Sequence, residues 1–76
     1  MIKEHDRVVL RREIREEGLK AGDVGTVVHV YGKGEAFEVE FVALNGETVA
    51  IATLLASQVR PVHKREITYA RRLLQA

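Results

Sequence analysis

The chain has 76 residues, a formal net charge of +1 and no cysteine. A chain this short forms one small domain with a thin hydrophobic core, so a deep catalytic pocket is not expected, and the missing cysteines exclude disulfides and thiolate metal sites. The near-neutral charge is unlike that of a dedicated nucleic-acid-binding protein. No apolar run is long enough to span a membrane, and the start MIKEHDR has no signal-peptide core, so we expect a cytoplasmic protein with no membrane contact.

The chain begins with a predicted short strand and a long charged loop. The strand lies in DRVVLRR, residues 6–12, where Val8 and Leu10 share one buried face. The segment EIREEGLKA, residues 13–21, is charged and irregular, and the glycines at positions 18 and 22 stop any long helix. We therefore expect a loop of about ten residues that holds at most one helical turn.

The strongest strand signal in the chain is VGTVVHVY, residues 24–31, because it is rich in β-branched residues. Strict alternation along this segment places Val27, His29 and Tyr31 on one face of the strand. The connection Gly-Lys-Gly, residues 32–34, ends the strand with a tight turn.

The next two strands are predicted to form a hairpin. FEVEFV, residues 37–42, alternates, so its aromatic and valine side chains face a buried side and its two glutamates face solvent. Asn45-Gly46 is the most favourable dipeptide for a two-residue hairpin turn. The segment TVAIAT, residues 48–53, then returns as the partner strand.

A single 3₁₀ turn within residues 54–58 and a short strand, VRPV at residues 59–62, complete the predicted sheet. Pro61 has no N–H to donate to a ladder, so this strand is confined to an edge or a terminus. The order of strand, long loop, strand, turn, strand, hairpin, strand, turn and strand is that of an SH3-like five-stranded barrel. We therefore expect a mainly β fold of this kind.

The last part of the chain changes character. In KREITYARRLLQA, residues 64–76, apolar side chains recur at spacings of three and four residues, and Arg71 and Arg72 lie between them. This periodicity predicts a C-terminal amphipathic helix of about three turns. Its apolar face needs a surface to cover, either an open end of its own barrel or a partner chain or second copy. The predicted organisation is a barrel over residues 1–62 and a helical extension over residues 63–76.

Part of the chain resembles a known motif of small barrels. LKAGDVGTVVHVYGKGEAFEVEF, residues 19–41, is similar to the KOW motif of ribosomal and transcription-elongation SH3-like domains. The similarity rests on Gly22-Asp23, Gly25 and the hydrophobic side chains at positions 27 and 30. It implies a turn that leads into a barrel strand.

A closer resemblance, over residues 1–62, is to the uncharacterised bacterial family called domain of unknown function 4926. The matching residues are Asp6, Val8, Leu10, Glu16-Glu17-Gly18-Leu19, Gly22 to Val28, Tyr31, Glu38 to Phe41, Gly46-Glu47-Thr48 and Val59-Arg60-Pro61. The resemblance implies a small SH3-like fold and carries no activity, catalytic residue or cofactor. Genes of this family often lie beside other small genes, an arrangement similar to that of antitoxin or immunity proteins.

The residues that could carry chemistry do not form a catalytic or metal-binding pattern. Gly22 and Gly25 lead into a strand, not a helix, and lack the Lys and Ser or Thr of a phosphate loop. The three histidines are 24 and 34 residues apart, which fits no compact zinc pattern. Glu38 and Glu40 are expected to form a solvated acidic face. We therefore expect no enzyme, no cofactor and no metal site.

The leading functional hypothesis is a non-catalytic protein-interaction module of the antitoxin or immunity type. Its expected partner is the product of a neighbouring gene, or a second copy that associates through the C-terminal helix. The acidic first loop, the end of the central strand and the tail helix would supply the contacts. The residues concerned are Glu16, Glu17, Tyr31, Ile67, Tyr69, Leu73 and Leu74.

The alternative hypothesis is a KOW-like protein that binds RNA or DNA. Basic residues outnumber acids between positions 60 and 72, and the first strand and the last strand of an SH3-like barrel run close together. The low aromatic content argues against single-strand binding by stacking. The candidate phosphate-binding residues are Arg11, Arg12, Arg60, Arg65, Arg71 and Arg72.

Overall fold

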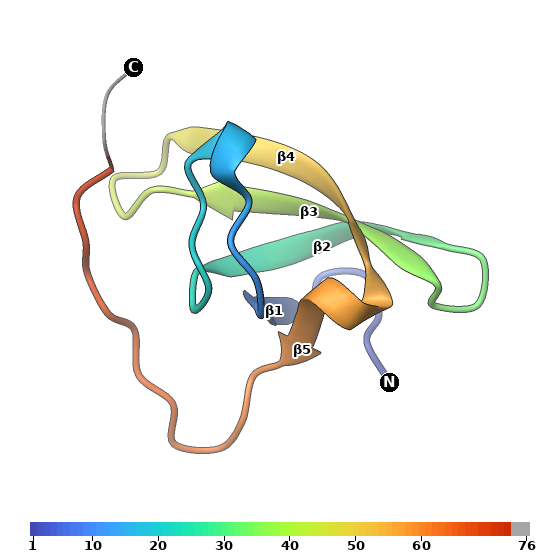
Figure 1. Cartoon of the computed structure of the whole chain (residues 1–76). Helices are drawn as coiled ribbons and strands as arrows, with labels where there is room; N and C mark the ends of the chain where they lie inside the picture. The colour runs from blue at the N-terminus through green and yellow to red at the C-terminus, as the bar shows by residue number, and fades with distance from the viewer. Residues whose placement is uncertain (74–76) are drawn as a thin grey trace.

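The computed structural model describes residues 1–73, in which five strands form one antiparallel sheet. The elements are β1 (Arg7–Leu10), η1 (Arg15–Glu17), β2 (Val24–Tyr31), β3 (Ala36–Val42), β4 (Thr48–Leu55), η2 (Ala56–Gln58) and β5 (Val59–Pro61). The strand order is β4-β3-β2-β1-β5, so β4 and β5 are the two edges of a strongly curved sheet (Figure 1).

The predicted mainly β fold with five strands is confirmed. The predicted closure into a barrel is not found, because no ladder joins β4 to β5 within residues 1–73. The long first loop holds the single turn η1, and a second 3₁₀ turn, η2, lies between β4 and β5 as expected. Pro61 lies in an edge strand, where its missing N–H costs no ladder hydrogen bond.

The hydrophobic core lies on the concave side of the sheet. Phe37, Val39 and Phe41 point into it, as their alternation predicts. They pack with side chains from every other strand and from the first loop. These are Val8, Leu10, Leu19, Val27, Ala50, Leu54 and Val59. One β1 residue departs from the predicted alternation, since Val9 is buried as well, on the opposite side from its neighbours.

The faces of β2 differ from those predicted by strict alternation. Val27 pairs with Val39 while His29 pairs with Glu38, so Val28 is an extra residue that forms a β-bulge. The bulge reverses the side-chain direction along the strand. His29 and Tyr31 therefore lie on the outer face, opposite the buried Val27, and the prediction that all three share a face was wrong.

The β3–β4 connection is longer than the predicted two-residue turn. The N–H of Ala43 donates to the carbonyl of Glu47 at 2.8 Å, and the N–H of Gly46 donates to the carbonyl of Ala43 at 2.9 Å. A register shift between Phe41 and Val42 accompanies this wider loop. Gly46 supplies the positive φ of 98° that the loop requires, so the glycine was assigned to the right turn but the wrong turn type.

The predicted C-terminal helix is also wrong for the residues that the structure describes. Residues 62–73, called the tail below, leave β5 and run in an extended path toward the β3–β4 connection (orange to red in Figure 1). Two side chains of the tail, Glu66 and Arg71, bind partners on the sheet side. The five residue steps between them span about 16 Å when extended and only about 8 Å in a helix, so pairing at both points favours the extended form.

Helical structure in residues 1–73 is limited to η1 and η2, each of three residues. Nothing helical in that part of the chain is both long and apolar enough to cross a membrane. The tail is instead positioned by side-chain contacts with a groove beside β1 and β2, which explains why Val9 is covered on its outer side.

Candidate interaction surfaces

The residues predicted to bind a partner do not form one continuous surface. Glu16 and Glu17 lie exposed in η1, and the tail passes close to that loop because Arg71 reaches the carbonyl of Gly18. Tyr31 ends β2, seven residue steps or about 23 Å along the strand from the end that faces the tail. The molecule therefore has two separate candidate surfaces.

The tail residues of the predicted set have different environments. Ile67 and Tyr69 are 92% and 88% exposed, which is unusual for large apolar side chains. Leu73 is partly buried and lines the groove beneath the tail. Leu74 lies outside the described residues.

The first surface is the outer face of β2, β3 and β4, on the convex side of the sheet. Cross-strand pairs place Ala36 beside Leu55, Glu38 beside Thr53 and Glu40 beside Ile51. Apolar and acidic side chains thus alternate on one face. The exposed large side chains in this group are Tyr31 (42%), Ile51 (54%) and Leu55 (60%).

Hydrogen bonds hold the polar groups of the outer face in place. Oε1 of Glu38 accepts from the hydroxyl of Tyr31 at 3.0 Å and from the hydroxyl of Thr53 at 2.7 Å. The hydrogen bond to the carboxylate raises the pKa of Tyr31, so the phenol stays protonated. The His29 ring meets the Tyr31 ring edge-on, with centroids 4.6 Å apart. Tyr31 is therefore a rigid element of this surface.

The backbone of β4 exposes unpaired N–H and C=O groups along the free edge of the sheet, next to the outer face. The N–H of Ala56 donates to the carbonyl of Glu35, whereas the N–H of Leu55 donates to the side chain of Gln58. Because N–H and C=O groups alternate in direction along an antiparallel strand, Ala50, Ala52 and Leu54 bond β3, and Ile51 and Thr53 point away. Ile51 and Thr53 therefore present free backbone groups at the sheet edge.

The composition of β4 does not protect this edge. Natural edge strands are usually shielded by a charge, a proline, a bulge or a covering segment. The segment TVAIATLL, residues 48–55, has eight residues without charge, proline or glycine, and its one register shift lies at its start, beside Phe41. No main-chain hydrogen bond from another described segment reaches its outer side. The free edge of β4 and the adjoining outer face are together called the β4 surface.

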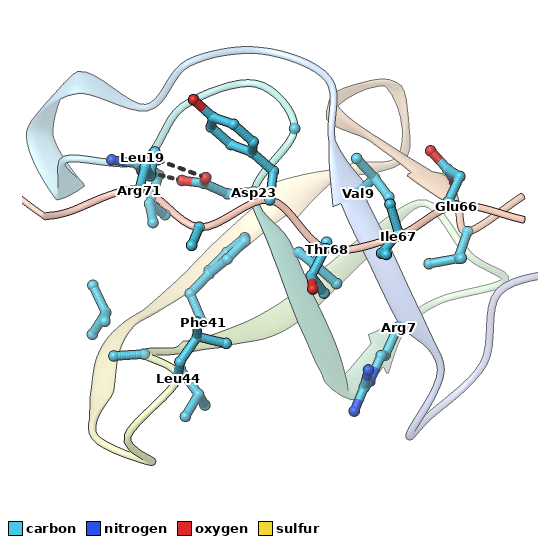
Figure 2. A pocket seen from close by; sticks show the side chains of 18 of the residues that line it. Arg7, Val9, Leu19, Asp23, Phe41, Leu44, Glu66, Ile67, Thr68 and Arg71 are labelled. Atoms are coloured by element: carbon cyan, nitrogen blue, oxygen red, sulfur yellow. Dashed lines mark hydrogen bonds and ion pairs between the residues drawn. The ribbon is translucent and has the colours of Figure 1, made fainter.

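The second surface is a groove between the tail and the sheet, called the tail groove, with a volume of about 420 Å³ (Figure 2). Its floor is mainly apolar and comes from β1, β2 and the β3–β4 hairpin, while the tail forms the opposite wall. The floor residues include Val9, Leu19, Val24, Phe41, Leu44 and Val49.

Asp23 binds the tail at one end of this groove. Nε of Arg71 donates to Oδ1 of Asp23 at 3.0 Å, and Nη2 of Arg71 donates to Oδ2 (Figure 2). Nη2 also donates to the carbonyl of Gly18 at 3.2 Å. The Asp23 and Arg71 side chains are each only 21% exposed, so this two-point pair is partly shielded from water. Asp23 is held for this contact because its Oδ2 also accepts from the N–H of Lys20 at 2.8 Å.

Arg60 of β5 binds the tail at the other end, through Glu66. Nη1 and Nη2 of Arg60 donate to its two carboxylate oxygens at 3.0 and 2.7 Å, and the N–H of His63 donates to Oε1 at 2.6 Å. These hydrogen bonds, above all those from Arg60, lower the pKa of Glu66 to about 2. The carboxylate is therefore charged at every physiological pH.

The predicted nucleic-acid residues fall into two groups. Arg60 and Arg71 are bound to carboxylates, as described above. The remaining four, Arg11, Arg12, Arg65 and Arg72, are exposed, and no ion pair of residues 1–73 includes them. The structure thus leaves only part of the proposed basic set available to phosphate.

The residues weighed for chemistry have structural surroundings. A Cβ on Gly25 would lie 2.5 Å from Cγ1 of Val39 and 2.9 Å from Cε2 of Phe41, so this glycine permits close approach of β2 to β3. In residues 1–73, no three His, Asp or Glu side chains gather as metal ligands, and no polar side-chain atom is both buried and unpaired.

Sequence reasoning missed the β4 edge and the role of Asp23. The uncharged run TVAIATLL beside the acidic strand 37–42 was the available signal for the edge, but only the strand order shows that β4 has one neighbour. Nothing in the sequence indicates that Asp23 and Arg71, 48 positions apart, form a pair.

The fold defines a small antiparallel β protein with two candidate interaction surfaces. The family model described as Domain of unknown function (DUF4926) matches residues 4–61, and the chain belongs to this family. The match includes all five strands and ends before the tail. Searches of curated proteins and of solved structures found no significant match.

Proposed function

We propose that the chain is a non-catalytic protein-interaction module that binds an extended segment of another protein along β4. The observation that carries this proposal is the free, uncharged edge of eight residues, flanked by exposed apolar side chains on one face. An added strand would gain hydrogen bonds from the backbone groups of Ile51 and Thr53. Pairing of this kind supplies affinity through the main chain and selectivity through alternate side chains.

The β4 surface also defines the chemistry of the partner segment. Side chains of an added strand that lie on the outer face would contact Ile51 and Leu55, which favours apolar residues. Glu38 and Glu40 lie one strand further in, so a Lys or Arg in the segment would find an opposite charge. We propose that the product of a neighbouring gene supplies this segment, in an arrangement of the antitoxin or immunity type.

The same proposal includes an SH3-like arrangement in an open form. The strand order β4-β3-β2-β1-β5, the long loop between β1 and β2, and the 3₁₀ turn before β5 support it. Closure of a barrel pairs its edge strands and leaves few free backbone groups for a partner. In an open form of the same arrangement, the β4 edge stays free.

A charge at the edge should weaken binding of the partner. We expect Ile51→Lys to reduce the affinity for the co-expressed neighbouring gene product at least tenfold, because an edge lysine opposes the docking of an apolar strand. Thr53→Pro should act similarly by removing an outward N–H that β3 does not use. Calorimetric titration measures the affinity, and circular dichroism checks that each variant keeps its sheet.

Ile67→Lys is the matched control, because it introduces the same charge at a more exposed isoleucine on the tail. It should leave this affinity unchanged. If Ile67→Lys abolishes binding and Ile51→Lys does not, the partner binds the tail and the β4 proposal is wrong.

The nucleic-acid hypothesis remains the second proposal, with less support. Exposed Arg11 and Arg12 in the first loop and Arg65 and Arg72 in the tail favour it. The engagement of Arg60 and Arg71 by carboxylates counts against it, since a phosphate would have to displace an existing partner.

A further inference from the structure

The tail is attached to the rest of the chain through its side chains. Arg71 binds Asp23 and the Gly18 carbonyl, and Glu66 binds Arg60. Within residues 67–73 no main-chain hydrogen bond to the sheet is formed. Side-chain contacts of this kind can be made equally well by an identical segment that arrives from another molecule.

The segment that connects β5 to the tail is strained. Arg65 has a φ of +65°, a left-handed conformation that an arginine adopts at a cost of about 1 kcal/mol or more. The turn that contains it is closed by a long hydrogen bond of 3.4 Å from the N–H of Glu66 to the carbonyl of His63. Straightening residues 62–65 would release this strain.

The tail leaves apolar surface uncovered when it lies on its own sheet. The tail groove keeps a volume of about 420 Å³ between the tail and its apolar floor. Ile67 and Tyr69 point into solvent with nine-tenths of their surfaces exposed. For a chain of 76 residues with a thin core, covering such surface by a second copy would be a substantial gain.

We propose that the tail is exchanged between two copies of the chain. Residues 66–73 of each copy lie in the tail groove of the other, so Arg71 of one binds Asp23 and the Gly18 carbonyl of the second copy. Exchange keeps the contacts between the tail and the groove, because both copies present identical groups in a closed two-fold pair. It gives up the hydrogen bond from His63 and releases the strained turn at Arg65.

The two crossing connections explain the exposed side chains of the tail. In a two-fold pair, residues 62–65 of the copies run past one another near the axis, and the start of each tail lies beside them. Ile67 and Tyr69 then have a second copy to pack against, where the single copy leaves them in water. This interface is separate from the β4 surface, so it does not depend on the proposed function.

Reversal of one ion pair distinguishes exchange from folding back. The variant Asp23→Lys places a lysine beside Arg71, so two cations face each other. The variant Arg71→Glu places a glutamate beside Asp23, so two carboxylates face each other. Each variant by itself has like charges at the groove, whether the tail is its own or comes from an identical copy. In an equimolar mixture, each tail finds an opposite charge only in the groove of the other variant.

We therefore expect each single variant to be monomeric and the mixture to form a heterodimer with twice the 8.5 kDa mass of one chain. Native mass spectrometry identifies the heterodimer, because the two variants differ in mass. Ile51→Lys should not prevent its formation, whereas it should weaken partner binding at β4. Arg72→Glu, the neighbouring charge reversal at an exposed arginine, should leave the wild-type dimer intact.

A monomeric mixture would overturn the proposal if the double variant Asp23→Lys/Arg71→Glu is itself monomeric and regains a protease-resistant tail, since the pair is then made within one chain. A measurement on the unmodified protein covers the case in which the single variants do not fold. Sedimentation equilibrium should show a monomer–dimer equilibrium for the wild type that Arg71→Gln shifts toward monomer. A wild-type chain that stays monomeric up to millimolar concentration would equally overturn it.

Discussion

At the scale of single residues, Asp23 and Gly25 have different tasks within one turn. Asp23 accepts hydrogen bonds from the N–H of Lys20 and from Arg71, so it closes the first loop and holds the tail. Gly25, two residues later, lets β2 approach the side chains of β3. The Gly-Asp-Val-Gly stretch therefore serves the fold and the tail groove together.

We expect Gly25→Ala to lower the free energy of unfolding by about 1–3 kcal/mol, because the new methyl overlaps Val39 and Phe41 in a packed core. Gly22→Ala should cost about 1–2 kcal/mol for a different reason, since Gly22 has a φ of +96° and no atoms near its Cβ position. Urea denaturation measures both values.

A double-mutant cycle tests the two causes. Val39→Ala makes room for the methyl at position 25, so the two changes should be strongly coupled. Val39→Ala and Gly22→Ala should be additive. Additivity in both pairs would show that crowding against Val39 is not the reason for glycine at position 25.

At the scale of elements, the tail is a segment whose conformation is decided by its two ends. Glu66 bound to Arg60 and Arg71 bound to Asp23 stretch the residues between them. The helical spacing of the apolar residues is outweighed, because a three-turn helix alone is marginal in water and would break one of these pairs. The tail is consequently an extended segment that is bound at Glu66 and Arg71 and leaves apolar side chains exposed.

The anchor at Glu66 should depend on pH in a defined window. Its folded-state pKa of about 2 lies below the ordinary value of 4.5, so the stabilisation is complete above pH 4.5 and is lost as the pH falls through about 2. We expect the difference between the His63 amide shifts of the wild type and of Glu66→Gln to stay constant from pH 7 to 5 and to change only as the pH falls toward about 2. Nuclear magnetic resonance titration checks this.

Glu66→Gln is the control for that titration, because the amide cannot titrate. Its His63 resonance should lie near the free position at every pH, and only a smaller shift from other groups should remain. A midpoint near pH 4.5 in the wild type would mean that Glu66 is not bound to Arg60 in solution.

At the scale of the whole molecule, charge is distributed unevenly although the net charge is +1. Glu38 and Glu40 lie on the outer face, while the tail and the first loop supply most of the exposed arginines. The acidic outer face and the side that bears the tail therefore differ in electrostatic character. The exposed arginines create only a modest positive electrostatic potential for a polyanion.

We therefore expect any binding of duplex DNA or RNA to be weak and strongly dependent on salt. With about four exposed arginines as phosphate contacts, the affinity should fall roughly 100-fold between 50 and 200 mM salt. Fluorescence anisotropy with a labelled duplex measures this slope. Arg11→Gln should weaken such binding, and Arg71→Gln should not. Tight binding at 200 mM salt that is lost in Arg71→Gln would favour the nucleic-acid proposal over the β4 proposal.

The local sequence pattern was sufficient to predict those features of the fold that neighbouring residues determine. FEVEFV alternates without interruption, and its apolar side is the core. Pro61 lies at an edge, and both 3₁₀ turns occur where charged or mixed segments interrupt the strands. In each case the deciding interaction is the period of the strand or the geometry of one residue, which the sequence contains directly.

Tertiary contacts decided the features that the pattern placed wrongly. The bulge at Val28 turns His29 and Tyr31 outward because β2 must match the register of β3 on one side and β1 on the other. The hairpin at Asn45-Gly46 widens with the register shift beside Phe41. The sheet stays open, and β4 keeps one unpaired edge. Each of these results depends on how strands far apart in sequence align.

The sequence by itself determined a small mainly β domain, its five strands and the family to which the chain belongs. Only the tertiary structure decided the extended tail, the free β4 edge and the tail groove. The sequence pattern around Arg71 predicts the polar side of a helix. In the structure, Arg71 instead binds Asp23, 48 positions away. A periodic pattern indicates which side chains share a face, but it does not indicate which distant part of the chain those side chains will contact.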